Sequence, residues 1–255
     1  MAKILIGYSA CPLTRAAFEA HGHDVWTCDL LPSRAANDNV PSAKHLQGDV
    51  WDYLHMDWDM AVLHPMCTYL AVSSSWALKD ANFERYPGVG YHQKVKPSTL
   101  TGAARRAAQA DEFENFRKLL ALPYPVAIEN PAPSSLNTNV RPPCQVIHPH
   151  HFGDDASKGT GLWLTKGLPL LKHTGSVEPR MVQGKNGMLP RWANQTDSGQ
   201  NNLSPGDDRW LQRSATYPGI AAAMGDQWGR YMLEVDAVRR ADNDNTPFDE
   251  LKVTV

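Results

Sequence analysis

The segment WDMAVLHPMC, residues 58–67, decides the fold because a short apolar run meets a thiol where the run ends. Its first part, residues 58–63, has the length and apolar character of a buried strand. The backbone of His64 is expected to be extended because a proline, Pro65, follows it. Cys67 then stands just beyond the strand end, where ligands of an α/β sheet bind.

Similar short apolar runs alternate with helical patterns along the first half of the chain, and a helical pattern returns near its end. Gly48-Asp49-Val50 marks the end of a further strand or a turn. Strands that alternate with helices indicate an α/β fold with a doubly wound, mostly parallel sheet. The other predicted strands are residues 3–6, 24–28 and 126–128, and the predicted helices are residues 14–21, 103–122 and 220–238.

Composition places the chain among ordinary globular proteins. Hydrophobic residues make up 42% of the 255 residues, and 25 basic against 27 acidic residues give a formal net charge of −2. This balance excludes a strongly basic nucleic-acid coat but is compatible with a local basic groove. No apolar run reaches the roughly 18 residues of a membrane helix, and the N-terminus is too short in its apolar part for a secretory signal. Four irregularly spaced cysteines agree with reduced thiols, so we expect a cytoplasmic protein.

Acidic residues follow three of the predicted strands, at Asp29, Asp49 and Glu129. Ligands of a doubly wound sheet bind beyond the carboxyl ends of its strands, so these side chains and Cys67 should face one crevice. Asp29 is suited to accept hydrogen bonds from ribose hydroxyls, and Asp49 from an adenine amino group. The alternative for both is the role of ordinary turn and helix-cap residues.

The order of these fragments resembles the DNA cytosine-5 methyltransferase family. The counterparts here are CDL (residues 28–30), GDV (48–50), HPMC (64–67) and ENP (129–131). The chain is more closely similar to short phage and prophage proteins of this type, through HPMCTYL (64–70), IENP (128–131), LWL with GLP (162–164 and 167–169) and RSATYPGIA (213–221). The resemblance covers roughly residues 3–235 and rests on the joint order of the fragments.

The resemblance implies a Rossmann-like fold of the S-adenosylmethionine methyltransferase type with a small loop-rich elaboration. It implies a cytosine-C5 modifying enzyme that uses S-adenosylmethionine and acts on DNA, in a host cytoplasm if a phage encodes it. Cys67 would attack C6 of the base and Glu129 would contact N3, with Asn130 as the third catalytic residue. The residues assigned to the cofactor are Ser9, Asp29, Asp49, His64 and Pro65, and those assigned to the substrate are Thr68, Lys158 and Arg213.

Several features depart from the larger family. Residues 7–14 hold one glycine, Gly7, where the family has Phe-x-Gly-x-Gly, and close backbone approach to a cofactor usually needs glycine. Met66 replaces the proline before the thiol, Pro131 replaces a valine, and no Gln-x-Arg-x-Arg strand is evident. Two other functions therefore stay open: a pyrimidine-nucleotide C5-modifying enzyme, or a non-catalytic module that binds DNA or a host protein on a decayed methyltransferase fold.

The chain is expected to divide into a core, an elaboration and a closing helix. Residues 1–131 form the predicted catalytic and cofactor-binding core, residues 132–213 a loop-rich recognition elaboration, and residues 214–240 the closing helix. Residues 241–255, rich in Asp and Asn, are expected to be a mobile tail. Residues 79–101 have no sustained period, which indicates an active-site loop or an insertion.

One cluster of potential metal ligands stands in the second half, at Cys144, His148, His150 and His151. A structural zinc site normally has four ligands, often as two separated pairs. No second pair is evident, so we expect a packed or hydrogen-bonded histidine cluster and no metal.

The second half also carries scattered cations, Lys158 and Arg213 among them, that suit a phosphate-binding face. A solvated surface is the alternative. Trp163, Trp192 and Trp210 are candidates to stack on bases, with core packing as the alternative for Trp163.

Overall fold

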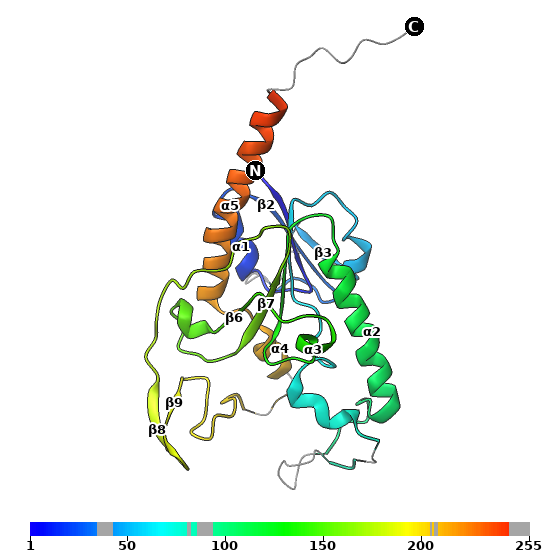
Figure 1. Cartoon of the computed structure of the whole chain (residues 1–255), viewed down its shortest axis with the longest axis vertical. Coiled ribbons are helices and arrows are strands. Elements are labelled where there is room, and N and C mark those ends of the chain that lie inside the picture. Colours follow the sequence, from blue (N-terminus) through cyan, green and yellow to red (C-terminus); the bar gives the residue numbers. More distant parts are fainter. Residues whose placement is uncertain (35–42, 81–82, 86–93, 205, 207–208, 245–255) are drawn as a thin grey trace.

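A seven-stranded sheet forms the centre of the computed structural model, and helices pack on both of its faces (Figure 1). The structure describes residues 1–34, 43–80, 83–85, 94–204, 206 and 209–244. The strand order is β3-β2-β1-β4-β5-β7-β6. The strands of this sheet are β1 (Lys3–Gly7), β2 (Asp24–Asp29), β3 (His45–Gln47), β4 (Met60–Leu63), β5 (Val126–Pro131), β6 (Gln145–Ile147) and β7 (Thr160–Leu164).

Strands β1 to β5 run parallel, whereas β7 runs antiparallel to both of its neighbours, β5 and β6. The order reverses beside β1, because β2 and β3 continue on one side and β4 and β5 on the other. Gly7, the last residue of β1, pairs with Cys28 of β2 and with Leu63 of β4. This arrangement is that of a Rossmann-like methyltransferase fold, so the predicted fold class is confirmed.

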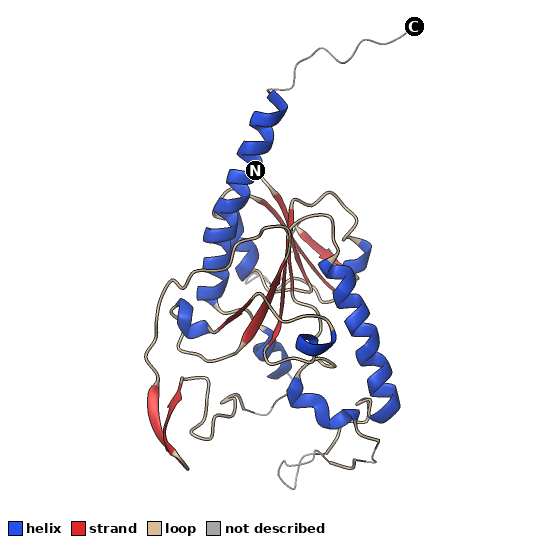
Figure 2. Ribbon diagram, in the orientation of Figure 1, coloured by secondary structure: helices blue, strands red, loops and turns tan. Residues whose placement is uncertain are grey.

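Helices and short 3₁₀ turns connect the strands, and a separate two-stranded hairpin lies apart from the sheet (Figure 2). Within the described residues, no helix combines the length and the apolar character needed to cross a membrane. The helices are α1 (Leu13–Glu19), α2 (Gly102–Leu120), α3 (Leu136–Asn139), α4 (Arg209–Ser214) and α5 (Pro218–Asp244). The 3₁₀ helices are η1 (Val50–Asp52), η2 (Val72–Leu78) and η3 (Pro149–Phe152), and the hairpin strands are β8 (Arg180–Gly184) and β9 (Gly187–Arg191).

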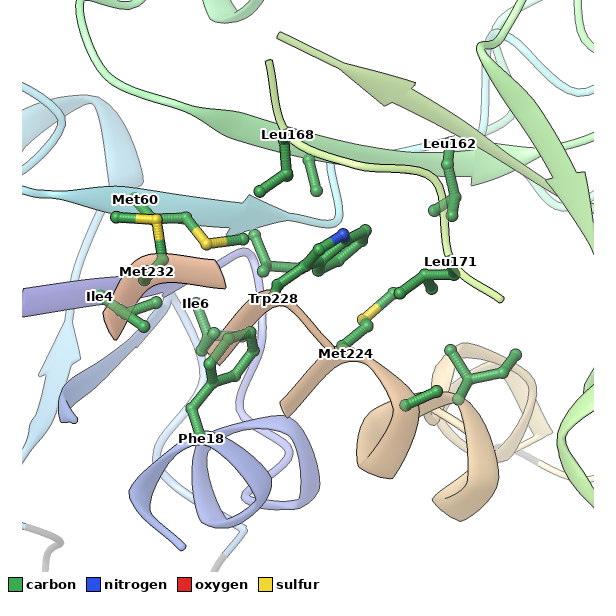
Figure 3. Close-up of a cluster of buried hydrophobic side chains, with 14 of the residues drawn as sticks. Ile4, Ile6, Phe18, Met60, Leu162, Leu168, Leu171, Met224, Trp228 and Met232 are labelled. Atoms are coloured by element: carbon green, nitrogen blue, oxygen red, sulfur yellow. The ribbon is translucent and has the colours of Figure 1, made fainter. Parts of the chain in front are cut away.

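Helices α1 and α5 cover one face of the sheet (Figure 1). In the core beneath them, Phe18 of α1 and Trp228 of α5 pack near Ile6 of β1, and all three are fully buried (Figure 3). The two helices approach closely at Gly225, where an added Cβ would lie 2.6 Å from the backbone of Ala17. Burial of apolar surface on this face is the main term that holds the helices to the sheet.

Helix α2 covers the opposite face. Its Phe116 packs edge-on against Trp163 of β7, with the ring centroids 5.2 Å apart and the planes at 78°. Trp163 is fully buried and its Nε1 donates to the Arg141 carbonyl at 2.8 Å. Trp163 is therefore a core residue, and it is not available to stack on a base.

Two predicted boundaries differ from the structure. The division at residue 131 cuts through the central sheet, because β6 and β7 come from the range predicted to be a separate elaboration. Strand β7 is buried along its whole length, so its sequence shows no alternation that would separate it from a loop with apolar residues. Residues 241–244 end α5 and are not part of a tail. Residues 245–255, and residues 81–82 and 86–93 of the predicted active-site loop, lie outside the described residues.

Candidate functional site

The predicted strand ends meet at one edge of the sheet. Because β1 to β5 are parallel, the residues at their carboxyl ends lie along the same edge of the sheet. The strand register places these residues at similar positions along the strand direction. His64 follows Leu63, which pairs with Ile128, and Glu129 follows Ile128. Asp49 and Cys67 follow β3 and β4, whereas Asp29 is the last residue of β2 and Glu129 lies within β5, which continues to Pro131. A shared site for these four side chains stays a prediction.

The loop from His64 to Ala71, called the thiol loop below, is anchored on several sides. The His64 amide donates to the Gly7 carbonyl at 3.1 Å, and Asn130 Nδ2 donates to the Pro65 carbonyl at 3.2 Å. Further anchors include Arg105 Nη2 to the Thr68 carbonyl, Gln109 Nε2 to the Tyr69 carbonyl at 2.7 Å and the Ser135 amide to the Leu70 carbonyl at 3.0 Å. The backbone that carries Cys67 is thus fixed by hydrogen bonds from β1, β5 and α2, and from Ser135, the N-cap residue of α3.

His64 and Glu129 form a buried pair at this edge. His64 Nδ1 lies 3.1 Å from Glu129 Oε2, and the two side chains are 16% and 14% exposed. Burial acts to raise the pKa of Glu129, but the imidazole of His64 and the ammonium of Lys158 outweigh it and hold that pKa below its usual value. Glu129 is therefore ionised near neutral pH.

Lys158 connects Glu129 with Cys67 electrostatically. Burial raises the pKa of the Cys67 thiol, while the positive charges of Lys158 and Arg213 act in the opposite direction. The ammonium of Lys158 also lowers the pKa of Glu129. One cation thus acts on both the thiol and the carboxylate, in agreement with the adjacent parallel strands β4 and β5 that carry them.

The topology explains how Lys158 reaches this edge from a distant part of the sequence. Strand β7 runs antiparallel to β5, so its first residue, Thr160, pairs with Pro131 at the carboxyl end of β5. Lys158 lies two residues before Thr160, and its Nζ donates to the Arg213 carbonyl at 3.1 Å. The structure therefore brings together two of the three predicted substrate residues. Thr68, the third, lies on the thiol loop with an exposed side chain.

Three buried polar atoms of the site lack a hydrogen-bond partner among the described residues. They are His64 Nε2, Asn130 Oδ1 and Glu129 Oε2, whose contact with His64 Nδ1 is an ion pair without hydrogen-bond geometry. Asn130 is only 1% exposed, and its amide nitrogen is already engaged with Pro65. Buried polar atoms are normally paired, so unpaired atoms on residues at one strand edge indicate a site that a polar ligand completes.

The residues predicted to bind a cofactor make local turns. Asp29 Oδ1 accepts from the Leu31 amide at 2.9 Å, and Asp49 Oδ1 caps η1 by accepting from the Trp51 amide at 3.1 Å. Ser9 is buried, and its hydroxyl accepts from the Cys11 amide at 3.3 Å within the same turn. These bonds match the turn and cap roles that were the alternative reading, and they use one oxygen of each carboxylate.

The carboxylate acceptors at the ends of β2 and β3 suit S-adenosylmethionine. The second carboxylate oxygens of Asp29 and Asp49 accept no hydrogen bond from the part of the chain that is described, so they can accept from ribose hydroxyls and an adenine amine. This cofactor carries no phosphate, so it does not require a glycine-rich anion cradle. Gly7 itself serves packing, because an added Cβ would lie 2.6 Å from Leu63 and 2.8 Å from Val50.

The histidines of the second half form a cluster of ring contacts. His151 stacks on His173 with centroids 4.1 Å apart, His150 stacks on Trp192 at the same distance, and His150 meets His151 edge-on. Burial and the neighbouring imidazoles lower the pKa of His151 to about 4, so His151 is neutral near pH 7. Cys144 bonds to Leu164 instead. Over the described ranges, no group of three or more His, Cys, Asp or Glu side chains is arranged to hold a metal ion.

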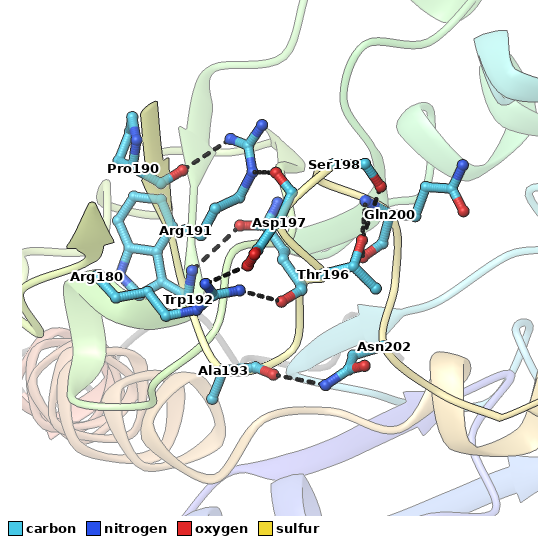
Figure 4. A network of polar contacts seen from close by, with 11 residues as sticks. Arg180, Pro190, Arg191, Trp192, Ala193, Thr196, Asp197, Ser198, Gln200 and Asn202 are labelled. Carbon is cyan, nitrogen blue, oxygen red and sulfur yellow. Dashed lines mark hydrogen bonds and ion pairs between the residues drawn. The ribbon is translucent and has the colours of Figure 1, made fainter. Parts of the chain in front are cut away.

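The hairpin of β8 and β9 is built from exposed residues and its own turns (Figure 4). Arg180 pairs with Asp197 and donates to the Gln195 carbonyl, and Arg191 donates to the Asp197 carbonyl at 3.1 Å. Trp192 at its base is engaged by His150, so this predicted stacking residue already has a ring partner. The side chain of Trp210 lies outside the described residues.

Sequence reasoning missed the pairing of His64 with Glu129. It assigned His64 to the cofactor and Glu129 to N3 of the base. The signal was present in the chain, because each residue directly follows one of two apolar runs that become adjacent parallel strands.

Comparisons with known proteins add little to this picture. No protein family model matches the chain, and no curated protein matches it. Among solved structures, a mutant of DNMT2 from Spodoptera frugiperda resembles it with a TM-score of 0.31 and 13% identity, over 69% of this chain and 54% of that one. The chain thus spans about half the length of that protein. Function must therefore be inferred from the residues of the site.

Proposed function

We propose that the chain is a cytosine-C5 modifying enzyme, an S-adenosylmethionine-dependent DNA cytosine-5 methyltransferase. The observation that carries the proposal is the placement of Cys67 and Glu129 at the carboxyl edge of two adjacent parallel strands, β4 and β5, with His64 in contact with Glu129. It supports a nucleophile and a base-contacting acid at one end of a methyltransferase-type sheet, beyond the carboxyl ends of its strands.

The chemistry of cytosine requires these two groups. C5 is a poor nucleophile until the thiolate of Cys67 bonds to C6 and the electrons of the C5–C6 double bond move into the ring. A hydrogen bond or proton from Glu129 at N3 stabilises the charge that this addition creates. After C5 has been modified, it loses its proton to a base and the bond between sulfur and C6 breaks, which restores the double bond and the thiolate.

The other residues of the site position these groups. Burial raises the pKa of the Cys67 thiol on balance, and the charge of Lys158 opposes that effect in part, toward the thiolate. Asn130 holds the thiol loop through the Pro65 carbonyl. Asp29 and Asp49 would hold the adenosine of S-adenosylmethionine, which supplies an electrophilic methyl group when it is bound.

The substrate is proposed to be DNA, contacted by Lys158, Arg213 and the exposed Thr68. A cytosine in a duplex has to leave the base stack before a thiol reaches C6. Phosphate contacts by lysine and arginine make binding weaken steeply as salt rises. Measuring binding of a cytosine-containing duplex at several salt concentrations therefore tests the DNA assignment, and a free pyrimidine nucleotide is the comparison ligand.

The decisive experiment is nucleoside mass spectrometry on cells that express the wild-type chain or Cys67→Ala. We expect a methylated cytosine in the DNA of wild-type cells and a loss of about 10³-fold or more in the variant, because the nucleophile is gone. Cys144→Ala is the matched control, since Cys144 is exposed and bonds to Leu164 on β7 instead of facing Glu129.

Three results would contradict the proposal. Equal modification by Cys67→Ala removes the thiol from the mechanism. A modified base confined to the nucleotide pool assigns the chain to the nucleotide-modifying alternative. No modification in any pool by folded protein favours the non-catalytic binding module.

A further inference from the structure

The pair of His64 and Glu129 has a feature that the proposed function does not use. Glu129 is ionised at rest, so by itself it lacks the proton that would neutralise charge at N3. The imidazole of His64 is in contact with it, with Nδ1 at 3.1 Å from Glu129 Oε2. A small rotation of either side chain would align the two groups for proton transfer.

We propose that His64 is the proton-storing partner of Glu129, a positioning residue that supplies the proton Glu129 passes to the base. The inference rests on the proposed function, because it names the source of a proton in the same reaction. It goes beyond the sequence prediction, which assigned His64 to the cofactor.

The proton balance closes within the pair. When the thiolate bonds to C6, the proton on His64 Nδ1 moves to Glu129 Oε2, and a carboxyl proton of Glu129 moves to N3. The base is then neutral, Glu129 is again a carboxylate and His64 is a neutral imidazole. When the sulfur–carbon bond breaks, the same proton returns from N3 through Glu129 to His64, so the pair is regenerated without a further reactant.

The surroundings of Glu129 support this assignment. The charged groups that act on it are His64, which follows β4, and Lys158, which precedes β7. Lys158 is also held by the Arg213 carbonyl from α4. On α2, the charged side chains act elsewhere: Arg105 donates to the Thr68 carbonyl, and Glu112 acts on Tyr8.

A purely structural ion pair is the competing explanation, and one observation weighs against it. A buried ion pair stabilises a fold only when its remaining donors and acceptors are also satisfied. His64 Nε2 is buried and has no hydrogen-bond partner within the described ranges. The pair is thus poorly built for stability and well placed to meet a ligand.

The first test measures the pair without any reaction. Carbon-13 NMR of Glu129 in the full-length protein gives the pH at which its carboxyl titrates, in the wild type and in His64→Asn. Asparagine keeps a nitrogen donor but stores no proton. We expect Glu129 to titrate at higher pH in the variant, because burial then acts with less opposition. An unchanged titration would overturn the proposal.

The second test follows exchange of the cytosine C5 hydrogen in deuterated water, in a duplex oligonucleotide without a methyl donor. Addition of Cys67 and protonation at N3 suffice for this exchange. We expect His64→Asn to slow it by about 10²-fold near pH 5.5, where an imidazole ordinarily carries a proton to give, and by much less near pH 8.5, where an imidazole is ordinarily neutral. A merely structural role predicts the same loss at both pH values.

The matched control is His21→Asn. His21 also faces a carboxylate, Asp226, but at 3.8 Å and with the two side chains 26% and 45% exposed. Exchange should be unchanged in this variant. Wild-type exchange that is equally fast in His64→Asn overturns the inference and leaves the proposed function standing. No exchange by folded wild-type protein overturns the proposed function and the proton supply together.

Discussion

The thiol loop and the β8–β9 hairpin are both held by polar contacts, but the contacts differ in reach. In the thiol loop, bonds from Asn130 and Gln109 join residues 65 and 40 positions apart in sequence. In the hairpin, the pair of Arg180 with Asp197 spans 17 positions, and the bond from Arg191 spans six. The conformation of the thiol loop therefore depends on the folded sheet, whereas the conformation of the hairpin is held mainly by contacts between residues close in sequence.

Burial separates the two regions as well. The side chains of His64 and Glu129 are 16% and 14% exposed, while those of Arg180 and Asp197 are 45% and 79% exposed. Charges interact strongly where water is excluded and weakly where it is not. Removal of a charge at the sheet edge should therefore change the rate of the reaction, whereas removal of a charge in the hairpin should change that rate little.

Replacing Lys158 by methionine is the strongest test of this contrast. Loss of its charge raises the pKa of Cys67 further and removes a group that stabilises the ionised Glu129. We expect methyl transfer near pH 7 to fall by about 10²-fold and to recover partly at alkaline pH, where the thiol ionises without help. The pH dependence of Cys67 alkylation by iodoacetamide measures the same shift without any substrate.

Lys185→Met is the matched change in the hairpin, because Lys185 lies in the turn between β8 and β9. It should leave both profiles unchanged, and Lys158→Arg should keep most of the activity. If the pH profile of Cys67 alkylation moved to higher pH by the same amount in both methionine variants, the net charge of the chain, and not the placement of Lys158, would set the pKa of the thiol.

The sequence predicted the parts of the fold that local patterns encode. Apolar runs gave β1, β2, β4 and β5, and the residue after each run gave the candidate edge. The helical period at residues 103–122 gave α2, whose observed end at Leu120 lies just before Pro123. These elements depend on neighbours in sequence, so a single chain carries enough information to place them.

The strands and site contacts that the sequence did not predict depend on contacts between segments that are distant in sequence. Strand β7 has a sequence that also suits a loop, and only its pairing with β5 brings Lys158 to the site. The contact of His64 with Glu129 requires β4 and β5 to be adjacent and in register. Sequence analysis named all three residues, but no local pattern encodes which of them touch.

Asn130→Ala should have an intermediate effect, and the quantity that it lowers most directly is the stability of the fold. The change removes the donor to the Pro65 carbonyl, at 3.2 Å, from a side chain that is 1% exposed. An unsatisfied buried carbonyl costs about 1–3 kcal/mol, which is a drop of several degrees in Tm for a chain of this size. Differential scanning calorimetry measures it. An unchanged Tm would show that the thiol loop does not depend on β5.

The smallest effect is expected from Asp197→Ala in the hairpin. Its carboxylate is largely exposed and pairs with Arg180, and water and salt screen such pairs, so the expected loss of stability is under about 1 kcal/mol. The backbone contacts of the turn remain, because Arg180 still donates to the Gln195 carbonyl and Arg191 to the carbonyl of residue 197. Calorimetry and the cytosine exchange assay should both give wild-type values. A loss as large as that of Asn130→Ala would show that the hairpin is coupled to the sheet, and it would remove the distinction between a region shaped by the whole fold and one shaped by its own turns.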